Sequence, residues 1–199
     1  MSSTITTKKI DWSKYGVVYA GVQDQIGPAG LVITIVRNDL VGKHRKDTPA
    51  VLQWESQAKS PDSLPATLPC WQVYMCGLNL DYMLSLGGVN EIAARARTRS
   101  DLMYRCLDSS KGYYINDVEP QYRSRINIPF SVCNDAELEA KFLTEAASIN
   151  LLELKDPNQT IGCRASLYNA MPFEGTDALI NFMKDFMKDN RKACNSCKH

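Results

Sequence analysis

Tyr19-Ala20-Gly21-Val22-Gln23-Asp24-Gln25-Ile26-Gly27-Pro28-Ala29-Gly30 lies between two apolar, β-branched runs, at 17–20 and 31–36. Apolar runs on either side of a segment rich in glycine and proline predict a strand, a tight turn and a second strand. Near-continuous apolar runs are typical of central strands in a parallel sheet that is covered on both faces. We therefore expect both strands to belong to a buried parallel sheet, of which this chain carries only a part.

Downstream of the turn, the sequence predicts mixed helices and strands. Pro69 opens a helix that runs to Leu86, and a second helix follows over 90–107. An antiparallel strand pair is expected over 113–132, a helix over 136–148, a strand over 163–168 and a last helix that ends near 190. We expect Asn134 and Glu137 to cap the third of these helices and Thr176 to cap the last. Apolar residues recur on one face of the first helix, which is the pattern of an amphipathic helix: Trp71, Tyr74, Met75, Leu78 and Tyr82.

Four segments in register resemble the phosphoserine aminotransferases, which are class V enzymes that use pyridoxal phosphate. The turn resembles the family's AGAQKN(I/V)GPAG, and residues 117–130, DVEPQYRSRINIPF, resemble its NRS(R/K)MN(I/V)PF. Residues 164–171, RASLYNAM, resemble RAS(I/L)YNAM, and 87–89 resemble a Gly-Gly turn that follows the interdomain helix. The similarity runs from about 15 to about 188, and the 199 residues are about half the length of the family's chain.

The resemblance implies an α/β fold, the C-terminal part of a pyridoxal-phosphate-dependent transferase of fold type I. A remnant of the large-domain sheet would precede a small α/β sandwich. The expected division is a polar leader at 1–14, the remnant of the cofactor domain at 15–69, the interdomain helix at 70–86, the small domain at 87–191 and a polar tail at 192–199. A fragment of a longer gene product and a truncated paralogue both remain open.

The resemblance also identifies the family's Schiff-base lysine position, which is Asp24 here. An imine requires an amine nucleophile, so a carboxylate cannot replace the lysine, and it would add negative charge beside a phosphate ester. We therefore predict no catalytic residue and no bound cofactor. Gln23 and Thr67 align with family positions that contact the cofactor phosphate, and both are interpreted as vestigial. The neighbouring family asparagine is Ala66.

The substrate end shows the same losses. Arg164 aligns with the arginine that binds the substrate carboxylate in the family, and we interpret it as a vestigial substrate residue now used in packing or an ion pair. The family's Gly-His-Arg group corresponds to Asp156, Pro157 and Asn158, so two groups that would meet substrate anions are absent.

Composition excludes several classes of protein. A net charge of +1 gives no reason to expect nucleic acid or an anionic membrane as a partner, and no apolar run reaches the roughly 20 residues of a membrane helix. No secretory signal is visible, so we expect a cytoplasmic protein whose seven cysteines are reduced thiols. Cys194 and Cys197, with His199, have the spacing of a zinc or redox pair, but a closed zinc site needs four ligands and no metal site is expected.

Three functional hypotheses follow. The first is a catalytically inactive relative of the phosphoserine aminotransferases, retained to bind or regulate a partner; the family's homodimers suggest pairing with itself or with a full-length relative. The second is an active phosphoserine aminotransferase chain, in L-serine biosynthesis, that needs another polypeptide to supply the lysine. The third is a module that binds an anionic metabolite through Arg164. Strands without their sheet would expose edges and apolar faces, so we expect 15–36 to be disordered, repacked or covered by another chain.

Overall fold

The structure is a computed structural model that describes residues 2–60, 67–156 and 162–194. The chain forms two compact units, Met1–Ile92 and Ala93–His199, and it passes from the first to the second within one long helix. Each unit has its own cluster of buried apolar side chains.

The first unit combines a two-stranded hairpin with a long helix. Its elements are α1 (Ser2–Thr7), η1 (Trp12–Lys14), β1 (Val17–Gly21), β2 (Val32–Val36), η2 (Asn38–Leu40), η3 (Ala50–Leu52), α2 (Trp54–Ala58), α3 (Cys70–Ser85) and the start of α4 (Gly88–Ser109).

β1 and β2 pair antiparallel, with Val17 opposite Val36 and Gly21 opposite Val32. The predicted strands and turn are confirmed, but the prediction of a parallel sheet is wrong. About ten residues join the two strands, whereas a parallel pair needs a crossover of a dozen or more residues. The apolar runs therefore form a hairpin that reverses direction at the turn.

The core of this unit is small. Its buried members are Val22, Ile26, Cys76, Met83 and Ile92, and Ile5 of α1 packs against them. The structure forms the short helix α1 within residues 1–14, the segment predicted to be a polar leader, and Ile5 of this helix is its contact with the cluster.

Gly27 lets the turn approach α3 closely. A Cβ atom at Gly27 would lie 2.9 Å from Val22 Cγ1 and 3.2 Å from the backbone Cα of Cys76, whereas a Cβ at Gly21 would meet nothing within 4 Å. The turn and the helix therefore touch at a point where only a hydrogen fits.

This contact predicts unequal effects of two alanine substitutions. Gly27→Ala is expected to lower the free energy of unfolding by about 1–3 kcal/mol, since overpacking must displace backbone. Gly21→Ala, the matched control, is expected to change it by about 0.5 kcal/mol or less. Urea unfolding monitored by circular dichroism measures both, and equal effects would contradict the close approach.

The apolar face that the sequence predicts on α3 is largely exposed. Trp71, Tyr74, Leu78 and Tyr82 are all exposed, and the side chains that α3 buries are Cys76 and Met83. The hairpin is only two strands wide, so it covers a narrow stripe of the helix and leaves the aromatic stripe in solvent.

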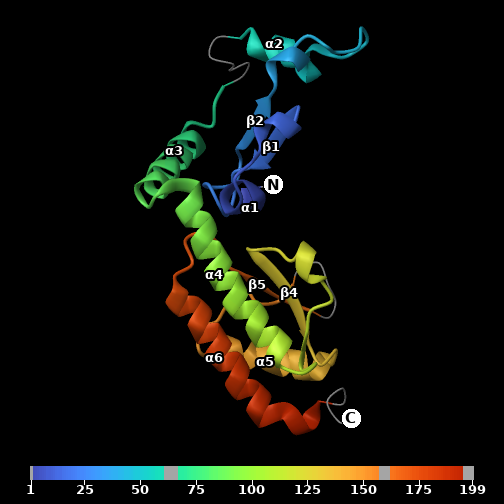
Figure 1. Ribbon diagram of the computed structural model, residues 1–199, viewed down its shortest axis with the longest axis vertical. Helices are drawn as coiled ribbons and strands as arrows, with labels where there is room; N and C mark the ends of the chain where they lie inside the picture. Colours follow the sequence, from blue (N-terminus) through green and yellow to red (C-terminus); the bar gives the residue numbers. More distant parts are fainter. Residues whose placement is uncertain (1, 61–66, 157–161, 195–199) are drawn as a thin grey trace. The chain divides into compact units, whose positions relative to one another are not determined.

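The second unit is a two-layer α/β sandwich, as the sequence predicts (Figure 1). Its elements after α4 are β3 (Tyr114–Ile115), η5 (Pro120–Tyr122), β4 (Asn127–Val132), α5 (Ala136–Ser148), β5 (Cys163–Ser166), α6 (Phe173–Asn190) and η6 (Arg191–Ala193). The strands form an antiparallel sheet in the order β3-β4-β5, and α4 and α6 run side by side.

Burial alternates along β4, which shows that one face of the sheet packs against the helices. Ile128, Phe130 and Val132 are buried, whereas the residues between them are only partly covered. Phe142 of α5 is fully buried, and its ring lies 5.9 Å from that of Phe130. A single aromatic cluster therefore joins the sheet to its helical layer.

Two predicted helix caps differ from those observed. Asp135, and not Asn134, caps α5, because its carboxylate accepts hydrogen bonds from the backbone N–H groups of Glu137 and Leu138. Asn134 instead accepts a hydrogen bond from the Ser131 hydroxyl. Thr176 does not cap α6, which begins at Phe173, and it lies fully buried within the first turns.

Cys133 and Cys194 form a disulfide that ties the end of β4 to the segment after α6. The prediction of reduced thiols is therefore wrong for this pair, and Cys194 is buried and not part of a polar tail. The fold brings together two cysteines that are 61 residues apart in sequence. Cys197 lies outside the described residues, and four cysteines are free thiols: Cys70, Cys76, Cys106 and Cys163.

Candidate functional site

The turn holds Asp24 in the left-handed region of the backbone map, with a φ of 71°. The backbone N–H groups of Ile26 and Gly27 both donate to the Val22 carbonyl at 3.0 Å. The Gln25 N–H donates to the Gln23 carbonyl at 2.9 Å, which closes the backbone around Asp24. Asp adopts this conformation more readily than most residues, so the turn places a carboxylate at its tip without a glycine.

A hollow of about 470 Å³ lies between this turn and α3, within the first unit. Trp71, Met75, Leu78 and Tyr82 line it from one stripe of the helix, and Asp24 lines it from the turn. Asp24 is the one charged residue among those that line the hollow. The sequence predicts both the turn and this face of α3, but it does not predict that they lie against each other.

The residues around Asp24 do not fit pyridoxal phosphate. No lysine is among the residues that line the hollow, so no amine is available there to form an imine. The one charge present is a carboxylate, which repels a phosphate ester.

The other predicted site residues are dispersed. Gln23 and Thr67 are exposed residues of the first unit, and Arg164 lies in the second unit, on β5 opposite Pro129. The Arg164 Nε atom is buried without a hydrogen-bond partner among the described residues. Asp156 is buried, and Pro157 and Asn158 lie outside the described residues.

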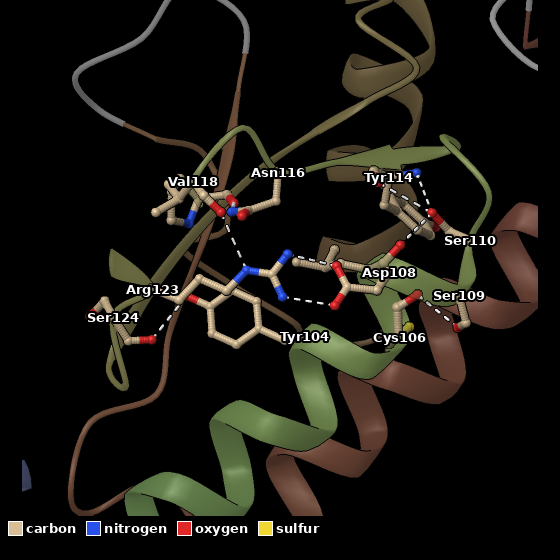
Figure 2. Close-up of polar contacts among 12 residues, drawn as sticks. Tyr104, Cys106, Asp108, Ser109, Ser110, Tyr114, Asn116, Val118, Arg123 and Ser124 are labelled. Carbon is tan, nitrogen blue, oxygen red and sulfur yellow. Dashed lines mark hydrogen bonds and ion pairs between the residues drawn. The ribbon is translucent and has the colours of Figure 1, made fainter. Parts of the chain in front are cut away.

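The Arg-Ser-Arg segment at 123–125 anchors the second unit's α4, a role that the motif alone did not reveal (Figure 2). Arg123 makes two 2.7 Å contacts with the Asp108 carboxylate, and its guanidinium carbon lies 4.5 Å from the centre of the Tyr104 ring. The Tyr104 hydroxyl donates to the Ser124 carbonyl at 2.9 Å, and Arg125 pairs with Asp101. A planar guanidinium suits both the carboxylate and the ring, and these contacts hold the segment against α4.

The hydrogen bond from Arg123 holds the pKa of the Asp108 carboxyl below its ordinary value of 3.8. A lowered pKa in the folded state stabilises the fold at pH values above 3.8, and this contribution is lost as pH falls through the folded-state pKa. At pH 7 we expect Asp108→Asn to lower the free energy of unfolding by about 1 kcal/mol or less, since Asp108 is half exposed. The difference from the wild type should shrink towards pH 3 in urea titrations, and a difference that is independent of pH would contradict this assignment.

No described helix is long and apolar enough to cross a membrane. Within the described ranges, no group of three or more His, Cys, Asp or Glu side chains is placed to hold a metal ion.

The chain belongs to the class V aminotransferase family, whose model matches residues 1–179. It is similar to phosphoserine aminotransferases in particular. It is 46% identical over 191 residues to the phosphoserine aminotransferase of Pasteurella multocida, which covers 96% of this chain and 52% of the relative. It is 42% identical over 186 residues to the chloroplastic phosphoserine aminotransferase 2 of Arabidopsis thaliana, and this match covers 94% of this chain and 44% of the relative.

Solved structures agree with this assignment. The phosphoserine aminotransferase from Bacillus circulans subsp. alkalophilus matches with a TM-score of 0.88 and 35% identity, over 96% of this chain and 52% of that one. A phosphoserine aminotransferase from Trichomonas vaginalis with bound pyridoxal phosphate matches with a TM-score of 0.83 and 28% identity, over 92% of this chain and 52% of that one. The chain thus spans about half the length of these relatives, and its fold matches part of the fold-type I aminotransferase chain.

Proposed function

We propose that this chain is a catalytically inactive relative of the phosphoserine aminotransferases that acts by binding a partner chain. The observation that carries the proposal is Asp24, which occupies the tip of the turn where the resemblance implies the Schiff-base lysine. We infer that the turn keeps its fold while a carboxylate replaces the family's reactive amine. A chain without this amine can still bind a partner chain, because such binding depends on the shape of the surface, whereas transamination requires the amine.

Exposed apolar surface in the first unit supports a partner. Tyr19 and Val32 of the hairpin are about 60% exposed, as is Trp71 of α3. Large exposed apolar side chains on one unit are typical of protein interaction sites. The partner we propose is a second copy of this chain or a full-length relative, since the family resemblance implies dimers.

Incubation with pyridoxal phosphate, followed by borohydride and peptide mass spectrometry, tests the loss of catalysis. We expect no lysine of the wild-type chain to be modified in stoichiometric yield. Asp24→Lys restores an amine at the turn, and Asp24→Asn is the matched control without one. Stoichiometric modification of one lysine in the wild type would overturn the proposal and favour an active chain, with or without a second polypeptide.

Arg164 favours a second candidate, a module that binds an anionic metabolite. Its Nε atom is buried without a hydrogen-bond partner among the described residues, and an unsatisfied buried donor costs free energy that an anion would recover. Calorimetry with O-phosphoserine and with glutamate tests this candidate. Binding that Arg164→Gln abolishes would support it, and absence of heat with both ligands would exclude it for them.

A further inference from the structure

We propose that the hollow beside Asp24 binds the guanidinium group of an arginine side chain presented by a partner chain. The proposal rests on the proposed function, because it names the chemistry by which the partner is held. It assigns a role to Asp24 itself, beyond the loss of the lysine.

Aromatic side chains form the helical wall of the hollow. Trp71 is 60% exposed and Tyr82 is 58% exposed, and both line it from the same stripe of α3. Positions separated by 11 residues lie on one face of a helix, about three turns apart. The face of an indole or phenol ring attracts a cation by about 0.5–2 kcal/mol, with the larger values where water is excluded.

Asp24 supplies the charge that selects a cation. It is the one charged residue that lines the hollow, and it makes no hydrogen bond or ion pair with any described residue. An apolar occupant would remove water from this carboxylate without replacing its hydrogen bonds, and an anion would be repelled. A guanidinium satisfies the carboxylate and stacks on one of the two rings.

Arginine suits this combination better than lysine. Its planar guanidinium stacks on aromatic faces and donates two parallel hydrogen bonds to a carboxylate, whereas an ammonium acts as a point charge. The Arg123 guanidinium already makes this arrangement elsewhere in the chain, with Asp108 and Tyr104.

A side chain from a partner explains the exposed residues around the hollow better than a small free cation does. Tyr74 and Leu78 of α3 are also exposed, beside Trp71 along the same helix. A partner that inserts an arginine would cover these apolar neighbours at the same time, which a small cation cannot do. The ion pair with Asp24 and the burial of apolar surface would then both contribute to the affinity for the partner.

The probe for this proposal is the peptide acetyl-Leu-Arg-Leu-amide, titrated into the ¹⁵N-labelled full-length chain. Its matched control is the same peptide with citrulline, which keeps the shape of arginine and removes the charge. We expect the arginine peptide to shift the Trp71 indole N–H resonance, assigned with Trp71→Phe, in a saturable and salt-sensitive way. We expect the citrulline peptide to bind about tenfold more weakly, as does the arginine peptide to Asp24→Asn; tenfold corresponds to about 1.4 kcal/mol.

Asp81→Asn is the matched control variant, because Asp81 is an exposed acid on the same helix that does not line the hollow. It should bind the arginine peptide as the wild type does. Equal binding of the two peptides, or equal weakening by Asp24→Asn and Asp81→Asn, would overturn the arginine site. The borohydride experiment is independent of these titrations, so a failed arginine site leaves the loss of catalysis standing, and a modified lysine overturns the proposed function whatever the titrations show.

Discussion

Phe142→Ala is expected to lower the free energy of unfolding of the second unit by about 3–5 kcal/mol. Phe142 is fully buried at the centre of the aromatic cluster. Its ring lies 5.1 Å from that of Phe182 and 5.2 Å from that of Phe186, and it also packs edge-on to Tyr114. Truncation removes contacts to the sheet and to α6 together and leaves a cavity that neither can fill without moving.

A second aromatic residue of the same unit provides the control. Tyr122 is 74% exposed, so Tyr122→Ala is expected to change stability by about 0.5 kcal/mol or less. Both variants are measured by urea unfolding, with near-ultraviolet circular dichroism reporting the aromatic packing. A change of about 1 kcal/mol or less for Phe142→Ala would show that the cluster does not hold the unit together.

Reduction of the Cys133–Cys194 disulfide is expected to lower the free energy of unfolding by about 4 kcal/mol, from the chain-entropy relation for a loop of this length. The bond closes a segment of 61 residues that contains α5, β5 and α6. Breaking it frees the unfolded chain to explore many more conformations, and it also releases the segment after α6 from the end of β4.

The measurement compares urea unfolding with and without dithiothreitol. Cys194→Ser should reproduce the reduced wild type and should itself be insensitive to dithiothreitol. Cys70→Ser is the matched control, because Cys70 is an exposed free thiol, and it should respond to dithiothreitol as the wild type does. A wild type whose stability is unchanged by dithiothreitol would contradict a stabilising disulfide.

Local pattern predicted most of the second unit. The apolar spacing of α4, α5 and α6 and the alternation along β4 are properties of neighbouring residues, so the sequence shows them directly. The caps of α5 and α6 were assigned wrongly because several polar residues near the start of each helix can accept a hydrogen bond. Helix boundaries are therefore harder to predict from sequence than the helices themselves. The pairing of Cys133 with Cys194 depends on how α6 returns to the sheet, and no local pattern contains that information.

The candidate site also has parts that the sequence predicts and parts that only the fold brings together. The motif predicts that Asp24 stands at the lysine position and that Arg164 lacks its family companions, and both remain predictions. The hollow lined by Asp24, Trp71 and Tyr82 could not be predicted from the sequence. Its two walls are about 50 residues apart in the chain and meet through the close approach at Gly27. The roles of Arg123 and Arg125 were also invisible, since their carboxylate partners lie on α4.

By itself, the sequence determined the family, the mixed α/β class and the absence of an amine at the turn, because motifs and residue identity are written in the order of the chain. The tertiary structure decided three further properties: the hairpin runs antiparallel, the aromatic stripe of α3 faces solvent, and Cys133 pairs with Cys194. Each depends on which distant segments are present to pack against a surface. A two-stranded hairpin covers only a narrow stripe of α3, so residues with the pattern of a buried face remain exposed.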